Sequence, residues 1–203
     1  MVNSIAAETK LALAGIPGRE AMPGLLEKTS KAALAASQSL SVLTLDLDHF
    51  KLYKDAKGHA AADSVLERLA ALLTASVPAG AVLAHLSGDE FVVMLPGADL
   101  AVAIPAAESL RAAVEAHFAD LDGPERLTIT IGVAASPADK RWTGDALLSL
   151  ADARMTFAKK RLTPHHNLVW GGTLPSDWYG RLDIDPSRWP SLRSRCDGAV
   201  TAL

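Results

Sequence analysis

Short apolar runs and longer segments with helical spacing alternate along the chain. Residues 40–45 form a β-branched apolar run with the length of one buried strand, and residues 127–134 alternate with the period of a strand. Residues 81–86 and 91–95 are two further apolar runs, and the Ser-Gly turn between them predicts a hairpin.

Helical periodicity fills the segments between these strands. Residues 59–76 place large apolar side chains on one helical face and charged side chains on the other, which predicts an amphipathic helix that packs on a sheet. Similar spacing predicts helices over about 99–118 and about 143–161. Gly58 is expected to end a shorter polar helix that follows the first strand.

The predicted order is strand, helix, strand, strand, helix, strand, with extra helices at both ends. It indicates the α+β class, with a ferredoxin-like or palm-type βαββαβ core around a central antiparallel sheet and an irregular C-terminal tail. The usual strand order of this core puts the first and third strands side by side. We expect an N-terminal entry segment with a helix (1–38), a main domain (39–169) and an aromatic extension (170–203).

Composition and charge narrow the classes of function. The chain has 203 residues, 49% of them hydrophobic, and can bury a full core. A formal charge of -3 with mixed signs gives no general attraction to nucleic acid or to anionic lipid. The single cysteine, Cys196, excludes an internal disulfide, and we find neither a signal peptide nor a membrane-length apolar segment. We therefore expect a cytoplasmic protein without membrane insertion.

Three carboxylates are expected to converge at one edge of the sheet. Asp46 follows the first apolar run, and Asp89 and Glu90 open the third. If these strands pair antiparallel, the end of one lies beside the start of the other. Carboxylates with a backbone carbonyl such as that of Leu47 are hard oxygen ligands suited to Mg²⁺ or Mn²⁺. The alternative is structural, because exposed strand ends are commonly acidic.

Lysines near these carboxylates are candidates for binding phosphate. Lys51 and Lys54 follow the first strand, and Lys159 closes the last predicted helix. Their ammonium groups can neutralise a triphosphate, or they can simply form a solvated face, which is the interpretation we favour for Lys54 and for Lys160 taken individually. Asp63 can accept hydrogen bonds from a guanine edge, or it can simply suit the helix dipole.

Short blocks in this order resemble the GGDEF family, the bacterial diguanylate cyclases. The resemblance runs from about Leu13 to Val169, so that residues 39–169 would be the catalytic domain. The blocks are Asp46-Leu-Asp-His-Phe-Lys51, Gly58-His59 with Asp63, Ser87-Gly-Asp-Glu-Phe91, Thr128-Ile-Thr-Ile-Gly-Val133, and Ala151-Asp152 with Ala158-Lys159.

The resemblance implies an activity: two GTP molecules, one on each domain of a homodimer, would be joined into cyclic di-GMP by metal-assisted attack of a 3′-hydroxyl on an α-phosphate. It also implies the roles of single residues. The metal would bind Asp46, the Leu47 carbonyl and Glu90, and Asp89 would lie at the reacting hydroxyl. The substrate would be bound by Lys51, Lys54, Asp63, Ser87, Gly88 and Lys159.

The sequence departs from the family pattern at several places, among them the entry motif (13–19) and the segment after the last helix (162–167). Ser87 replaces the first signature glycine, and Lys54 replaces an asparagine that contacts guanine. The segment 78–81 replaces the inhibitory R-x-x-D motif, so that we expect no allosteric inhibitory site there. Two alternatives therefore stay open beside the cyclase: a degenerate module that binds nucleotide without turnover, and a dimerisation scaffold whose aromatic tail docks a protein partner.

Overall fold

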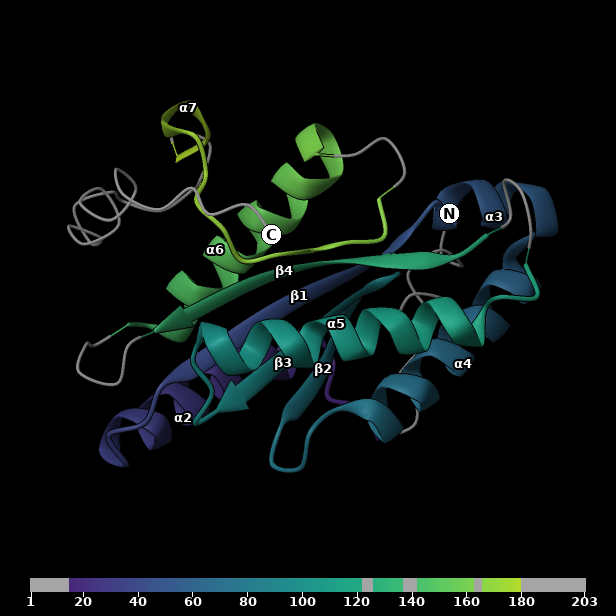
Figure 1. Cartoon of the computed structure of the whole chain (residues 1–203). Helices are drawn as coiled ribbons and strands as arrows, with labels where there is room; N and C mark the ends of the chain where they lie inside the picture. The colour runs from purple at the N-terminus through teal and green to yellow at the C-terminus, as the bar shows by residue number, and fades with distance from the viewer. Residues whose placement is uncertain (1–14, 122–125, 137–141, 163–165, 180–203) are drawn as a thin grey trace, which may run out of the picture.

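A five-stranded sheet with the order β2-β3-β1-β4-β5 forms the centre of the computed structural model (Figure 1). The structure describes residues 15–121, 126–136, 142–162 and 166–179, so Leu13, Trp189 and Cys196 lie outside the described residues. The strands are β1 (Leu40–Asp48), β2 (Val82–Ser87), β3 (Glu90–Pro96), β4 (Thr128–Ser136) and β5 (Val169–Trp170). The α+β class and the βαββαβ order of the core are as predicted.

The central strand β1 pairs antiparallel with β3 on one side and with β4 on the other. The predicted neighbourhood of the first and third strands is thus confirmed. The short strand β5, which the sequence did not predict, pairs parallel with β4. β1 also runs three residues further than the apolar run 40–45, because its pairing with β4 continues to Asp48 opposite Thr128. Asp46 consequently lies inside the strand and not beyond its end.

Helices cover both faces of the sheet (Figure 1). One core contains side chains of the helices after β1 and of the helix after the hairpin, with Leu43, Leu45 and Ile131 of the sheet. The other core joins Val42 and Ala134 to the helices near the two ends of the chain. The first group is α3 (Phe50–Lys57), α4 (His59–Ser76) and α5 (Leu100–His117), and the second is α2 (Met22–Ala35), preceded by a 3-10 turn (Arg19–Ala21), and α6 (Gly144–Phe157).

Two glycines allow α6 to lie close to its neighbours. A Cβ atom on Gly132 of β4 would lie 2.0 Å from the carbonyl oxygen of Ala151 on α6. A Cβ atom on Gly144, the first residue of α6, would lie 2.8 Å from the Cβ atom of Leu26 on α2. Real atoms do not approach this closely, so the absence of side chains at these positions determines how α6 packs on the sheet.

The helix predicted over about 143–161 differs from the observed one at its end. The α-helical part stops at Phe157, and residues Ala158–Leu162 form one π-helical turn. Single π turns widen the helix locally and are frequent at functional sites. Lys159 lies on this turn.

The first part of the predicted aromatic extension packs against the domain. Trp170 lies in β5, and Trp178 belongs to a short helix, α7 (Ser176–Tyr179). Trp178 is buried, and its ring meets that of Phe157 edge to face at 5.3 Å. Over the residues that the structure describes, no helix combines the length and the apolar character needed to cross a membrane.

Candidate functional site

Asp46 and Glu90 are directly opposite each other on the neighbouring strands β1 and β3. Directly opposed residues on one face have Cβ atoms about 4.5–5.5 Å apart, which brings the two carboxylates within reach of one cation. This pair ends the register between the two strands, so Leu47 has no partner residue on β3. Asp89 precedes Glu90 in the hairpin turn. The expected convergence of acidic residues at this edge is what the strand pairing produces.

The turn that carries Asp89 tolerates a serine in its first position. Gly88 adopts a φ of 51°, in the left-handed region that favours glycine, whereas the φ of Ser87 lies outside that region. The Ser87 hydroxyl donates a hydrogen bond of 3.0 Å to Oε2 of Glu90. A nitrogen of the His85 ring, Nε2, lies 2.9 Å from the Gly88 carbonyl oxygen. Ser87 therefore causes no backbone strain, and it contacts a predicted metal ligand.

Lys159 reaches the same edge of the sheet from the π turn. Its ammonium forms an ion pair with Oδ1 of Asp46 and lies 3.4 Å from Oδ1 of Asp48. Asp46 and Asp48 are two residues apart on β1, so both side chains lie on one face of the sheet. One lysine thus bridges two carboxylates, an arrangement that the sequence did not predict.

Asp48 is a fully buried carboxylate, and its role was missed in the sequence. Its Oδ1 accepts a hydrogen bond of 2.8 Å from the Thr130 hydroxyl, and its Oδ2 accepts one of 2.8 Å from the Thr128 hydroxyl. The backbone N–H of Asn167 donates a further bond of 2.9 Å to Oδ2. The one sequence signal was the matching period: Asp-x-Asp and Thr-x-Thr on paired strands place all four side chains on one face.

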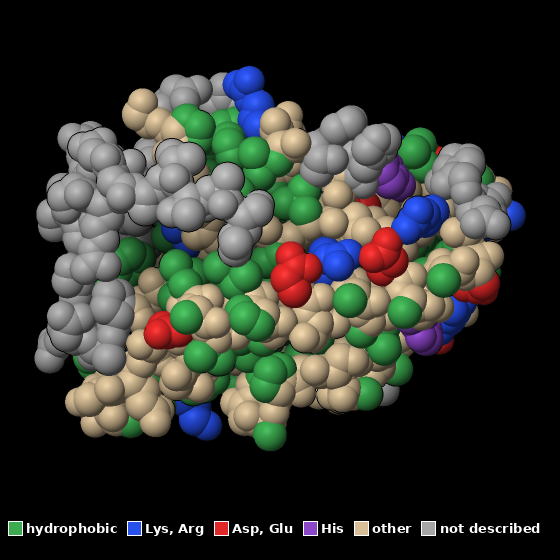
Figure 2. Space-filling view, in the orientation of Figure 1, with side chains coloured by type: hydrophobic (Ala, Val, Ile, Leu, Met, Phe, Trp, Pro, Cys, Tyr) green, Lys and Arg blue, Asp and Glu red, His purple; other side chains and the backbone are tan. Residues whose placement is uncertain are grey.

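The segment after the π turn is held by contacts on both sides of Asn167. While the backbone N–H of Asn167 binds Asp48, its side-chain Oδ1 accepts a bond of 3.0 Å from Arg111 of α5. The ring of His166 stacks on that of His49 at 4.9 Å. Figure 2 shows charged side chains of both signs grouped near the middle of the face of the molecule that is turned to the viewer. Arg111 also forms an ion pair with Glu115, at 2.9 Å.

Burial makes the acidic edge electrostatically unfavourable for further negative charge. Partial burial, followed by the charge of Asp46, raises the pKa of Asp89 from 3.8 to about 6. Burial also raises the pKa of Asp46, although the nearby Lys159 acts in the opposite direction. The pKa of Asp152 on α6 is raised by burial and then by the charges of Glu90 and Asp46. A cation bound here would relieve these repulsions.

The donor atoms at this edge suit a hard divalent ion. The carboxylates of Asp46 and Glu90 and the Leu47 carbonyl carry oxygen donor atoms, and the ammonium of Lys159 shows that a cationic group fits against Asp46. Among the described residues, no group of three or more His, Cys, Asp or Glu side chains is arranged to hold a metal ion. In this structure the Asp46 carboxylate is paired with the ammonium of Lys159.

The other predicted substrate residues lie on the helices that follow β1. Lys51 and Lys54 are on α3, where Lys51 is exposed and Lys54 is partly buried, and Asp63 is exposed on α4. Within the described ranges, none of the three has a hydrogen bond or an ion pair to the carboxylates of the site. The structure therefore brings together Asp46, Asp89, Glu90 and Lys159 and leaves these three on neighbouring helices.

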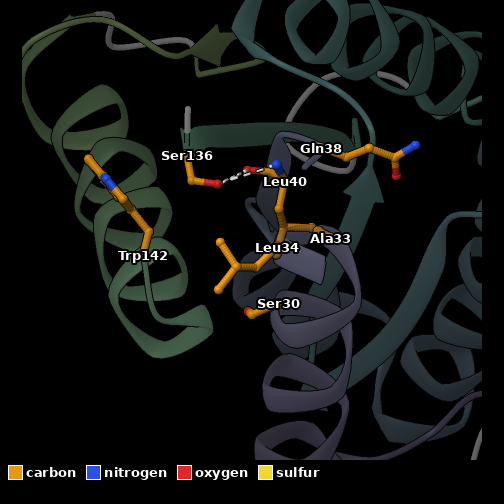
Figure 3. Close-up of a pocket in the computed structure, with 7 residues that line it drawn as sticks. All are labelled: Ser30, Ala33, Leu34, Gln38, Leu40, Ser136 and Trp142. Atoms are coloured by element: carbon orange, nitrogen blue, oxygen red, sulfur yellow. Dashed lines mark hydrogen bonds between the residues drawn. The ribbon is translucent and has the colours of Figure 1, made fainter. Parts of the chain in front are cut away.

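A small surface pocket lies elsewhere, near the opposite end of β1 (Figure 3). It is lined by residues from α2, from the start of β1 and from the end of β4, and includes Leu40 and Ser136, which are hydrogen-bonded to each other. Trp142 closes one side of it. Because Asp46 and Asp48 are at the other end of the strand, this pocket is separate from the acidic site.

Comparison with known proteins gives consistent matches. Residues 12–164 match the family described as diguanylate cyclase, GGDEF domain. The chain is 36% identical over 149 residues to the response regulator PleD of Caulobacter vibrioides, covering 72% of this chain and 33% of PleD. It is 36% identical over 151 residues to the diguanylate cyclase TpbB of Pseudomonas aeruginosa PA14, covering 73% of this chain and 34% of TpbB.

A solved structure agrees with these sequence matches. The GGDEF domain of TpbB from Pseudomonas aeruginosa superimposes with a TM-score of 0.68 at 33% identity, covering 78% of this chain and 91% of that one. The chain spans about a third of the length of the curated relatives that it matches. The family match covers most of the chain, and the fold and the acidic edge agree with it. This chain belongs to the GGDEF family of diguanylate cyclase domains.

Proposed function

We propose that this chain condenses two molecules of GTP into cyclic di-GMP. The observation that carries the proposal is the direct pairing of Asp46 and Glu90 across β1 and β3, with the ammonium of Lys159 against Asp46. Two carboxylates and a cation at one partly buried edge form a site for a divalent metal and a polyphosphate. Membership of the GGDEF family and the similarity to TpbB support the choice of reaction.

Asp46, Glu90 and the Leu47 carbonyl would hold Mg²⁺ or Mn²⁺, and Ser87 would orient Glu90. Either ion, when bound, supplies positive charge that offsets the charge developing on the phosphates. Asp89 would lie beside the attacking 3′-hydroxyl and accept its proton, since a pKa of about 6 is close to the operating pH. The hydroxyl oxygen bonds to the α-phosphorus of the second GTP, the bond to the β-phosphate breaks, and pyrophosphate leaves.

Substrate binding would involve the lysines and the start of α4. Lys51 and Lys159 would neutralise the triphosphate, and the backbone at Gly88 would approach it closely. Asp63 would accept hydrogen bonds from the ring and amino N–H groups of guanine, and Lys54 would donate to its O6 or N7 atom. Adenine offers Asp63 no matching ring donor, so guanine is preferred.

The proposed active unit is a homodimer in which two domains face each other with one GTP each. A single domain holds one GTP, which has one 3′-hydroxyl and one α-phosphate. The two phosphodiester bonds of the cyclic product therefore require two GTP molecules in opposite orientation. A face-to-face pair supplies this symmetry. At equal GTP concentration, the rate per chain should therefore rise with protein concentration until dimers predominate.

The direct test is to incubate the chain with all four nucleoside triphosphates and Mg²⁺ and to analyse the products by mass. We expect cyclic di-GMP and pyrophosphate from GTP alone, and no product when the metal is chelated. Nucleotide affinity that depends on Mg²⁺ without any product would instead identify a module that binds nucleotide without turnover. The departure from the family pattern at Lys54 is an argument for this alternative. If the chain shows neither nucleotide affinity nor product, the remaining interpretation is the dimerisation scaffold.

A further inference from the structure

We propose that Lys159 is a stand-in cation that occupies the metal site until nucleotide arrives. Its ammonium neutralises Asp46 in the metal-free protein and then transfers to the triphosphate, while Asp48 keeps it at the site. This inference rests on the proposed function, because it assumes that Asp46 binds a metal together with a nucleotide. It adds that the site resists metal alone and accepts metal and nucleotide together.

The geometry puts the lysine and the metal in competition for one carboxylate. The Lys159 ammonium contacts Oδ1 of Asp46, the carboxylate directly opposite Glu90. The Lys159 and Asp46 side chains are only 19% and 20% exposed. A divalent ion shared by Asp46 and Glu90 must therefore displace the ammonium from a partly desolvated contact, where charges interact more strongly than in water.

Asp48 is fixed in a way that Asp46 is not. Both oxygens of Asp48 accept hydrogen bonds from β4 hydroxyls, and Oδ2 also accepts one from the backbone N–H of Asn167. Its side chain is 0% exposed. Asp46, by contrast, is held by its contact with Lys159. Asp48 is therefore a positioning residue: it cannot turn toward a metal, and it retains an attraction for the ammonium 3.4 Å away after the contact with Asp46 is lost.

The surrounding charges explain why a cation is needed before the metal binds. The negative charges of Glu90 and Asp48 disfavour the ionised form of Asp46. Those of Asp46 and Glu90 disfavour the ionised forms of Asp89 and Asp152. Without a cation these partly buried carboxylates would repel one another. The lysine relieves part of this repulsion in the metal-free protein.

The exchange couples the metal to the nucleotide. Metal alone displaces Lys159 from Asp46 and gives the ammonium no new anion, whereas metal with a triphosphate provides phosphate oxygens in its place. Each ligand should then raise the affinity for the other by the same factor, as binding linkage requires. A free divalent ion meets an Asp46 carboxylate that is already paired with an ammonium.

The decisive experiment is to titrate the protein with Mn²⁺ in the absence of nucleotide and to measure the free ion by electron paramagnetic resonance. We expect the Lys159→Gln variant to bind Mn²⁺ roughly tenfold more tightly than the wild type, because its competitor is gone. The same variant should bind a non-hydrolysable GTP analogue with Mg²⁺ more weakly. Lys160→Gln is the matched control, since Lys160 is the exposed neighbour on the same π turn, and it should change neither affinity.

A thermal shift gives a second readout. Without metal, Lys159→Gln should melt below the wild type, and Mn²⁺ should raise its melting temperature more than that of the wild type. Equal or weaker Mn²⁺ binding by Lys159→Gln would overturn the proposal. The titration needs no turnover, so failure of the wild type to form cyclic di-GMP would refute the proposed function and leave the competition between lysine and metal to be decided by Mn²⁺ alone.

Discussion

The Ser87 hydroxyl donates a hydrogen bond of 3.0 Å to Oε2 of Glu90, across the turn that joins β2 to β3. A glycine at this position, as in the family signature, has no side chain to make this bond. The substitution therefore adds a donor to a proposed metal ligand, and the ordinary φ of Ser87 means that it does so without backbone strain. Serine here is a compatible variant with a definable effect on Glu90.

Removing the Ser87 hydroxyl should lower the affinity for Mg²⁺ more than it lowers the rate of the chemical step. A hydrogen bond of this kind contributes about 0.5–1.5 kcal/mol, so Ser87→Ala should raise the Mg²⁺ concentration for half-maximal turnover by roughly two- to tenfold. The kcat at saturating Mg²⁺ should stay near that of the wild type. Ser87→Thr retains the hydroxyl and is the control. An unchanged Mg²⁺ requirement in Ser87→Ala would show that the bond does not orient Glu90.

The proposed metal ligands give a second prediction. Asp46→Ala or Glu90→Gln should abolish synthesis of cyclic di-GMP, because each removes a charged oxygen ligand, while the circular dichroism spectrum remains that of the wild type. Glu67→Gln changes an exposed carboxylate on α4 and should have full activity. Normal turnover in either ligand variant would exclude the metal site proposed between β1 and β3.

The third prediction concerns pH and stability without metal. The pKa of Asp89 is raised from 3.8 to about 6, so the protonated form is favoured in the folded state. The stability that protonation contributes is full below the unfolded pKa and is lost as the pH rises through about 6. Asp89→Asn stays uncharged. In chelator, its melting temperature relative to the wild type should therefore be higher at about pH 7.5 than at about pH 4. A difference independent of pH would contradict this.

The close approach of α6 to β4 gives a fourth prediction. Gly132→Ala puts a methyl group 2.0 Å from the Ala151 carbonyl oxygen. This overpacking should lower the free energy of unfolding by about 1–3 kcal/mol or more. Gly24→Ala is the matched control, because Gly24 is an exposed residue of α2 and has nothing within 4 Å of an added Cβ atom. It should stabilise the protein by about 0.4–1 kcal/mol. Urea unfolding measures both, and equal stability of the two variants would show that α6 can move away.

The last prediction concerns Lys54, where the chain departs from the family in the proposed base pocket. Lysine only donates hydrogen bonds, whereas asparagine both donates and accepts. Lys54→Asn should therefore increase GTP turnover, with an affinity gain of roughly two- to tenfold for one well-matched hydrogen bond. Initial rates over a range of GTP concentrations would measure it. A variant that turns over GTP no better, or that prefers another base, would mean that Lys54 serves a different ligand.

Much of the fold follows from patterns along the sequence. β-branched runs such as residues 40–45 and the alternation in residues 127–134 place the strands, and apolar spacing in residues 59–76 gives a helix with the observed bounds. The order of these elements then brings Asp46 to Glu90, because it puts the first strand beside the third. The acidic edge could be predicted since it depends only on strand order and on positions at strand ends.

The environment of Asp48 could not be predicted in the same way. Its partners Thr128, Thr130 and Asn167 are 80, 82 and 119 residues further along the chain, and its distance from them depends on register and on one loop. The ion pair of Lys159 with Asp46 depends on a π turn, which periodicity cannot distinguish from an α-helical end. Single contacts of this kind require the three-dimensional structure.

The bond from the Asn167 backbone to Asp48 affects the order in which the site is completed during synthesis. Asp48 emerges from the ribosome 119 residues before Asn167, and the central strands can collapse first. Until Lys159 and Asn167 reach their positions, Asp48 lacks a main-chain donor and its nearby ammonium. A nascent chain that ends before Lys159 would thus have the strands β1 to β4 but no ammonium at its acidic edge, and the site becomes competent only when almost the whole domain has been made.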